Sequence, residues 1–126
     1  MLKTRSSNFL PVGIVVIFII GCTMMITDNK LIFGEWTGVE WLVENSLSNH
    51  DPGQAKFSFD DEGNYTYQYG GDTEKGKFTF ANNQLFTTPD GGIKIMVKVP
   101  RIEQDTMVFE MNRGGQSERL TLIRSN

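Results

Sequence analysis

The sequence predicts an all-β domain, an up-and-down antiparallel meander of about eight strands that closes into a small barrel, after an N-terminal signal helix. Three observations favour this architecture. From Leu31 onwards, apolar and polar residues alternate with the period of half-buried strands. Turns rich in glycine and asparagine interrupt the alternation at near-regular intervals. No stretch after Ile26 keeps a helical period for three turns.

The first strand is expected over residues 35–44. Its mostly apolar face carries Val39, Trp41 and Val43. Trp36 falls on the opposite face, and a bulge at Gly38 would bring both tryptophans to the inside. The polar stretch 45–53 then forms the longest predicted loop and a candidate lid.

The other seven strands are marked mostly by apolar residues spaced two apart. In chain order these are Phe57 and Phe59; Tyr65, Tyr67 and Tyr69; Phe78 and Phe80; residues 85–88; Ile93, Ile95, Val97 and Val99; Met107, Phe109 and Met111; and residues 116–124. Pro100 is expected to end the sixth strand, because proline cannot donate to the ladder. Closing such a meander into a barrel hides its edges, and a flattened sandwich is the alternative.

The N-terminus has the features of an export signal. Lys3 and Arg5 form a basic head, and residues 12–20 form a short apolar core. Ile19-Ile20-Gly21-Cys22 then resembles a bacterial lipobox. We therefore expect a lipoprotein signal peptide over residues 1–21, a lipidated cysteine and tether over 22–30, and the barrel domain over 31–126. The alternative is an uncleaved signal anchor, because residues 10–26 carry no charge.

The resemblance to bacterial lipoproteins has consequences for location. It implies cleavage between Gly21 and Cys22, a diacylglycerol on the Cys22 sulfur, and a membrane partner reached through that lipid. It implies the bacterial cell envelope, with Thr23 after the cysteine favouring the outer membrane on its periplasmic or surface face.

A second resemblance, to small bacterial lipocalin-like (calycin-type) lipoproteins, spans roughly residues 31–125. Gly34-Glu35-Trp36 is similar to the Gly-x-Trp that opens the first lipocalin strand, and residues 59–65 resemble the hairpin that follows. The closing segment 120–124 fits the same layout. In lipocalins a basic side chain of the last strand covers that tryptophan, so the resemblance implies a barrel floor made by Trp36 and Arg124.

Composition argues against several classes of function. Cys22 is the only cysteine, so the domain forms no internal disulfide or thiolate metal site. Removing residues 1–21 leaves 105 residues (126 − 21), with ten basic and 15 acidic side chains and a net charge of −5. We therefore expect no nucleic-acid partner. We also expect no metal and no cofactor.

Catalytic residues are also sparse. His50 is the only histidine, and no recognisable nucleophile motif accompanies it, so we interpret it as a loop residue and the protein as a non-enzyme. Asp60, Asp61 and Glu62 lack the alternate spacing of a calcium loop and are interpreted as a charged hairpin turn.

Large apolar side chains could either line a ligand cavity or fill the barrel. The candidate cavity residues are Trp41, Phe57, Phe59, Tyr65, Tyr67, Phe78, Phe80, Ile95, Val97, Met107 and Phe109. The leading hypothesis is a lipoprotein that binds a small apolar or aromatic ligand in this cavity. The alternative is a filled barrel that binds another envelope protein through its loops.

Overall fold

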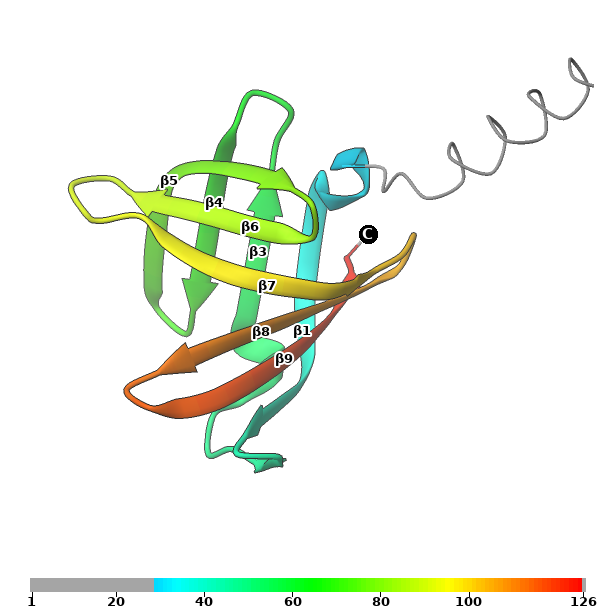
Figure 1. Cartoon of the computed structure of the whole chain (residues 1–126), viewed down its shortest axis with the longest axis vertical. Coiled ribbons are helices and arrows are strands. Elements are labelled where there is room, and N and C mark those ends of the chain that lie inside the picture. Colours follow the sequence, from blue (N-terminus) through cyan, green and yellow to red (C-terminus); the bar gives the residue numbers. More distant parts are fainter. Residues whose placement is uncertain (1–28, 126) are drawn as a thin grey trace, which may run out of the picture.

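The structure, a computed structural model, describes residues 29–125, so the predicted signal helix and Cys22 lie outside the described residues. The elements are η1 (Asn29–Ile32), β1 (Gly34–Val43), β2 (Ser46–Leu47), η2 (Pro52–Gln54), β3 (Ala55–Phe59), β4 (Asn64–Tyr69), β5 (Asp72–Ala81), β6 (Gln84–Pro89), β7 (Ile95–Ile102), β8 (Thr106–Arg113) and β9 (Gln116–Arg124) (Figure 1). η1 and η2 are short 3-10 helices. Within this part of the chain, no helix has the length and apolar character needed to cross a membrane.

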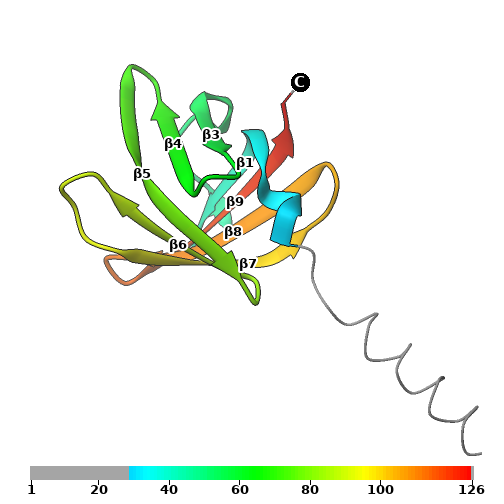
Figure 2. The ribbon, with the colours of Figure 1, turned by 90° about the horizontal axis from the view of Figure 1, so that it is seen from above.

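The strands form one antiparallel sheet that closes on itself. From β3 to β9 each strand pairs with the next one along the chain, and β1 pairs with β3 on one edge and β9 on the other. Eight strands therefore surround a common interior, as Figure 2 shows from above. β2 is an additional strand that pairs with the end of β1. The predicted meander is confirmed, and it closes into a barrel rather than flattening into a sandwich.

The bulge expected near Gly38 is present in β1. The register of β1 against β9 shifts between Gly38 and Glu40, so Val39 is an extra residue on the bulged strand. Trp36 and Trp41 consequently both face the interior, with exposed fractions of 0% and 5%. The expectation that Val39 faces inward was wrong, because the bulge turns its side chain outward.

The sixth predicted strand differs from expectation at both ends. Ile93 lies in the turn before β7 and is 82% exposed. Pro100 does not end the strand, since β7 continues to residue 102. The register against β8 shifts between Lys98 and Arg101, and this irregular stretch accommodates a residue that has no N–H to donate.

One end of the barrel is closed by a floor. Arg124 lies over the Trp36 ring, with its guanidinium carbon 4.2 Å from the ring centroid. The Trp36 indole N–H donates to the Ile32 carbonyl at 2.9 Å, and Arg124 donates to the carbonyls of Leu31 and Phe33. These bonds attach η1 to the end of the barrel, where Ile32 is fully buried.

Aromatic rings fill the interior above this floor. Phe59 and Phe78 meet edge to face at 5.0 Å, and Phe57 meets Phe109 in the same way at 5.1 Å. Edge-to-face pairs of this kind stabilise a core beyond the area that they bury. The floor half of the interior is therefore packed by the protein's own side chains.

Candidate functional site

The two ends of the barrel differ. η1 and the Trp36–Arg124 contact close the end at which β1 begins and β9 finishes. Stretch 44–54 and the turns after β4, β6 and β8 lie at the opposite end, because antiparallel strands alternate in direction. Figure 1 shows these turns at the left and bottom of the molecule, away from η1. We call this opposite end the open end.

Toward the open end the interior changes from apolar to mixed. Strand alternation and register place one set of inward-facing side chains there, which we call the open-end layer: Trp41, Phe57, Tyr67, Tyr69, Glu74, Met111, Arg113 and Glu118. Phe57, Tyr67, Tyr69 and Met111 are only partly buried against the core. Part of the surface of these four side chains is therefore accessible here beside charged groups.

Glu118 is the most deeply buried carboxylate of the open-end layer. Its side chain is 6% exposed, whereas that of its partner Arg113 is 57% exposed. The Trp41 indole N–H donates to Oε1 of Glu118 at 2.8 Å, and Nε of Arg113 donates to Oε2 at 3.0 Å. Both carboxylate oxygens are thereby satisfied, which a buried charge requires.

Glu74 provides a second carboxylate. The Tyr65 hydroxyl donates to Oε2 of Glu74 at 2.6 Å, and Glu74 pairs across the ladder with Tyr67. Burial raises the pKa of Tyr65 above its ordinary value, and the bond to Glu74 raises it further. Tyr65 therefore remains a protonated donor to Glu74 at neutral pH.

Tyr67 presents an unbonded hydroxyl in the layer. Its ring stacks on Phe57 at 4.5 Å, and the hydroxyl makes no hydrogen bond within residues 29–125. Burial is the main cause that raises the pKa of Tyr67; Glu74 and Glu118 raise it further and Arg113 lowers it. Tyr67 is thus within electrostatic reach of three charged side chains and has a hydroxyl free to contact a ligand.

The predicted long loop folds over one side of the open end. Stretch 45–53 contains β2 and most of η2 rather than being a plain loop. The His50 ring stacks on Trp41 at 4.4 Å and meets Tyr69 edge to face at 5.8 Å. The Asp51 N–H donates to the Tyr69 hydroxyl at 3.0 Å. Trp41 and Tyr69 of the open-end layer therefore hold the candidate lid against this layer.

A cavity of about 450 Å3 lies where β7 diverges from β8. The two strands pair from Lys98 and Glu110 toward the floor, and residues 95–97 and 111–113 have no partner across this gap. The cavity is lined by Leu42, Asn45, Met96, Lys98, Glu110, Met111, Asn112, Ser117, Glu118 and Arg119. Met111 and Glu118 belong to both the cavity and the open-end layer, so the cavity adjoins the layer from the side.

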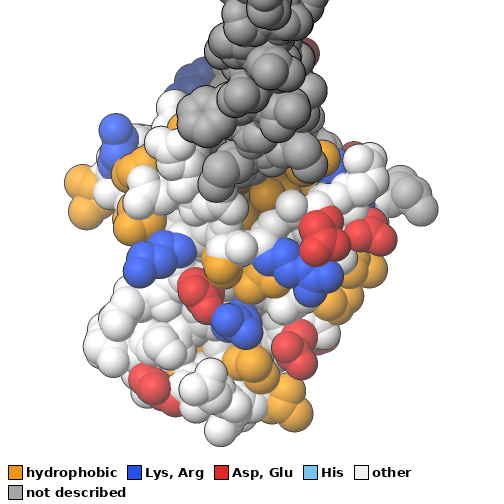
Figure 3. Space-filling model, turned by 45° about the vertical axis from the view of Figure 1, so that its right-hand side comes forward, with side chains coloured by type: hydrophobic (Ala, Val, Ile, Leu, Met, Phe, Trp, Pro, Cys, Tyr) orange, Lys and Arg blue, Asp and Glu red, His pale blue; other side chains and the backbone are white. Residues whose placement is uncertain are grey.

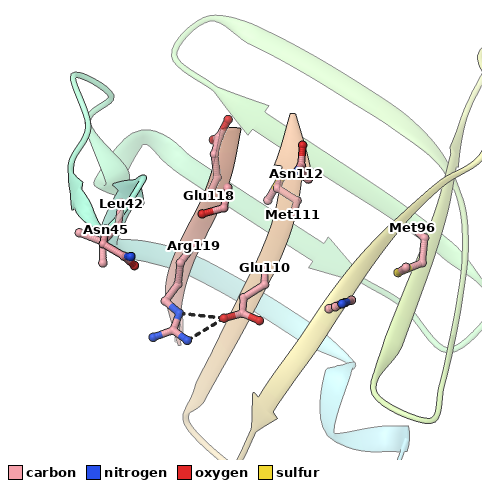
Figure 4. A pocket seen from close by; sticks show the side chains of 10 residues that line it. Leu42, Asn45, Met96, Glu110, Met111, Asn112, Glu118 and Arg119 are labelled. Atoms are coloured by element: carbon pink, nitrogen blue, oxygen red, sulfur yellow. Dashed lines mark hydrogen bonds and ion pairs between the residues drawn. The ribbon is translucent and has the colours of Figure 1, made fainter. Parts of the chain in front are cut away.

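Figure 4 shows the arrangement around this cavity. Arg119 and Glu110 project from β9 and β8 and form an ion pair, with Nη2 and Oε2 2.6 Å apart. Met96 of β7 lies across the cavity from this ion pair, and Asn45 lies on the other side of the β8–β9 hairpin. The cavity surface thus combines the thioethers of Met96 and Met111 with charged and amide groups.

The structure separates the predicted cavity residues into three groups. Most are packed into the core: Trp41, which also belongs to the open-end layer, and Phe59, Tyr65, Phe78, Phe80, Val97, Met107 and Phe109. Phe57 and Tyr67 are partly buried in the open-end layer. Ile95 is half exposed, because it sits at the start of β7 where the strand leaves β8. None of these predicted residues lines the 450 Å3 cavity.

Sequence reasoning missed the charged members of the open-end layer. Glu74 shares the strand face of Phe78 and Phe80, and Glu118 shares that of Leu120 and Leu122. This period-two spacing predicts an inward-facing carboxylate at each position. Arg113 carried no comparable signal, since it follows the last apolar residue of its predicted strand, Met111, and directly precedes Gly114 and Gly115.

Three further features of the described residues give weaker indications of a site. A second cavity of about 310 Å3 lies outside the floor beside η1 and includes Phe33 and Phe78 in its lining. Among residues 29–125, no group of three or more His, Cys, Asp or Glu side chains is arranged to hold a metal ion. On the face shown in Figure 3, basic and acidic side chains are interspersed rather than gathered by sign.

Comparison with known proteins supports the fold alone. No family model matches the chain, and no curated protein matches it. A lipocalin-like protein from Bacteroides uniformis superposes with a TM-score of 0.59 at 11% identity, covering 75% of this chain and 99% of that one. An uncharacterized protein from Bacteroides eggerthii superposes with a TM-score of 0.57 at 12% identity and the same coverage. The domain is therefore a lipocalin-like β-barrel.

Proposed function

We propose that this protein is a lipid-anchored lipoprotein of the bacterial cell envelope whose barrel binds a small ligand with an apolar or aromatic part. The ligand occupies the open-end layer and the adjoining cavity. The observation that carries the proposal is the partly buried Phe57–Tyr67 stack, in which Tyr67 has a hydroxyl without a hydrogen bond in the described structure, pairs across the ladder with Glu74 and lies within electrostatic reach of Glu118 and Arg113. Binding sites commonly combine apolar walls with a few polar groups that orient the ligand.

The closed half of the barrel limits where the ligand can lie. Phe59, Phe78 and Phe109 are buried and in ring contact, so they form a packed base below the open-end layer. A ligand therefore rests on this base instead of passing through the barrel. Phe57 and Tyr67 would contact its apolar part, and the polar groups of the layer would set its orientation.

The proposal is binding rather than catalysis. Its support is the surroundings of His50, a lid residue whose ring stacks on Trp41 and meets Tyr69 edge to face. A general base needs a proton donor or nucleophile within hydrogen-bond reach. In the described structure, the ring contacts of His50 are aromatic, which suits a lid residue.

The membrane attachment is proposed from the lipobox-like Ile19-Ile20-Gly21-Cys22. Asn29, the first described residue, lies at the closed end of the barrel. A tether leading back to a lipidated Cys22 would join the domain there. The open end would then remain available to ligand on the side away from the anchor.

Native mass spectrometry of the chain from Thr23 tests ligand binding. The described strands and the core that they enclose lie within residues 29–125, so this chain retains the barrel. We expect a discrete small-molecule adduct after incubation with lipid and metabolite extracts, lost on denaturation. Tyr67→Ala should weaken capture by about three- to tenfold, since an aromatic contact contributes roughly 0.5–1.5 kcal/mol.

Phe86→Ala is the matched control. Phe86 lies between inward-facing Leu85 and Thr87, so its ring is on the outside, near Lys94. Its loss should leave adduct formation unchanged. Equal losses in both variants would show that the adduct responds to stability and not to the open-end layer.

A second candidate is an interaction lipoprotein with a filled barrel. It is favoured by Leu47 in β2, whose side chain is 80% exposed on the stretch that covers the open end. Bare spectra after every extract, together with a protein partner whose binding is lost in Leu47→Ser, would replace the ligand proposal with this one.

A further inference from the structure

We infer that the ligand of the open-end layer is a small organic cation, with an ammonium or similar group beside Glu74 and Glu118 and an apolar part against Phe57 and Tyr67. This inference rests on the proposed function and names the chemical class of ligand. Four observations carry it: the charge of the layer, the arginine already bound in it, the ring faces and the free acceptor atom of Glu74.

The layer has an excess of negative charge. It contains two carboxylates, Glu74 and Glu118, against one basic side chain, Arg113. Charges that are partly shielded from water interact more strongly than on an open surface, so the excess favours a cation.

Arg113 shows that the layer accepts a cation. Its guanidinium reaches from the end of β8 to the buried carboxylate of Glu118, while 57% of its side chain stays in solvent. A ligand ammonium in this position would meet the same carboxylate. Arg113 is thus an internal competitor that a ligand displaces or lies beside.

The aromatic faces suit the same class of ligand. Tyr67 stacks on Phe57, and Trp41 lies at the other side of the layer with its N–H bound to Glu118. The face of an aromatic ring attracts a cation, most strongly when water is excluded. Oε2 of Glu74 accepts from Tyr65, and Oε1 has no partner in the described structure, so it can accept from an ammonium group.

Three probes that share a phenyl group separate charge from apolar contact. Phenethylamine is a cation at neutral pH, phenethyl alcohol is neutral, and phenylacetate is an anion. We expect calorimetric titration of the chain from Thr23 at low salt to give tightest binding for the amine, weaker binding for the alcohol and weakest for the anion. The preference for the amine should shrink at high salt.

Two conservative variants should act in opposite directions on the amine. Glu74→Gln keeps an acceptor for Tyr65 and should weaken amine binding about tenfold without changing the binding of the alcohol. Arg113→Gln removes the internal cation and should strengthen amine binding several-fold, a gain that loss of folding does not produce. Glu40 is exposed in β1 beyond the bulge, so Glu40→Gln controls for net charge. It should change neither amine binding nor alcohol binding.

The outcomes distinguish this inference from the proposed function. Equal binding of amine and alcohol, or tighter binding of phenylacetate, would overturn the cationic ligand and leave an open-end binding site. Weaker amine binding in Arg113→Gln would also overturn it. If no probe binds and extracts give no adduct, both proposals fail; if extracts give an adduct sensitive to Tyr67→Ala while no probe binds, only the cationic ligand fails.

Discussion

Tyr65 links the packed core to the open-end layer. Its ring is 2% exposed, near Phe59, while its hydroxyl donates to Glu74. Burial and the neighbouring carboxylate both disfavour the phenolate, so the pKa of Tyr65 is raised from its ordinary value of 10.0. The folded state therefore favours the protonated phenol, and this stabilisation is present below about pH 10.

This pKa shift predicts a loss of stability at alkaline pH. Above about pH 10 the Tyr65 phenol ionises in the unfolded chain but not in the folded one, so stability falls as pH rises. In Tyr65→Phe we expect a lower melting temperature at neutral pH and a smaller further decline between about pH 9 and pH 11. Thermal melts across this pH range measure the decline of the melting temperature. Tyr69→Phe, which leaves the Glu74 bond intact, should decline like the wild type; the same slope in Tyr65→Phe would contradict the assignment.

At the scale of the element, β1 depends on one glycine. A Cβ atom on Gly38 would lie 2.3 Å from the Pro52 carbonyl oxygen and 3.2 Å from Leu120 Cδ1. η2 therefore crosses directly over the bulge, and only a residue without a side chain permits this approach. The bulge in turn brings Trp36 and Trp41 to one interior, so the floor and the open-end layer both depend on it.

Gly38→Ala should consequently destabilise the domain. Either η2 or β1 has to shift, and overpacking of this kind costs about 1–3 kcal/mol. Gly71→Ala is the matched control, because a Cβ there meets nothing within 4 Å. Its effect should stay within about 0.5 kcal/mol. Urea unfolding of both variants provides the comparison. Equal midpoints would show that η2 moves away from the added methyl group without a loss in the free energy of unfolding.

At the scale of the whole molecule, the barrel has one closed and one open end. The closed end carries Asn29, where the chain enters, and the Trp36–Arg124 contact. The open end carries the lid, the divergence of β7 from β8 and the charged layer. This difference between the two ends places the proposed anchor and the proposed ligand at opposite ends of one small domain.

The proposed anchor is testable in the full-length chain. We expect the protein expressed in a bacterial host with lipoprotein processing to fractionate with membranes and to incorporate labelled fatty acid. Cys22→Ser should abolish the label, because serine offers no sulfur for the diacylglycerol. Thr23→Ser, next to the site, should retain it. Labelling of Cys22→Ser would exclude the lipobox assignment.

Much of the fold could be predicted because it depends on local patterns. Period-two alternation in β3, β4 and β9 and the turns between strands identified eight strands and their order. The glycine at position 38 also predicted the bulge of β1, but alternation alone placed Val39 on the wrong face and ended β7 at Pro100, where the register against β8 shifts. A bulge depends on what a neighbouring strand can accommodate, and single-strand periodicity does not contain that information.

By itself, the sequence determined the class of fold and the inward face of most strands, since alternation and turn chemistry are local properties of the chain. Only the tertiary structure decided that β1 meets β9, that β7 separates from β8, and that Glu74, Arg113 and Glu118 enter one layer. These features join residues far apart in the chain. They depend on how the curvature of a closed sheet is divided among strands, which only packing of the complete barrel determines.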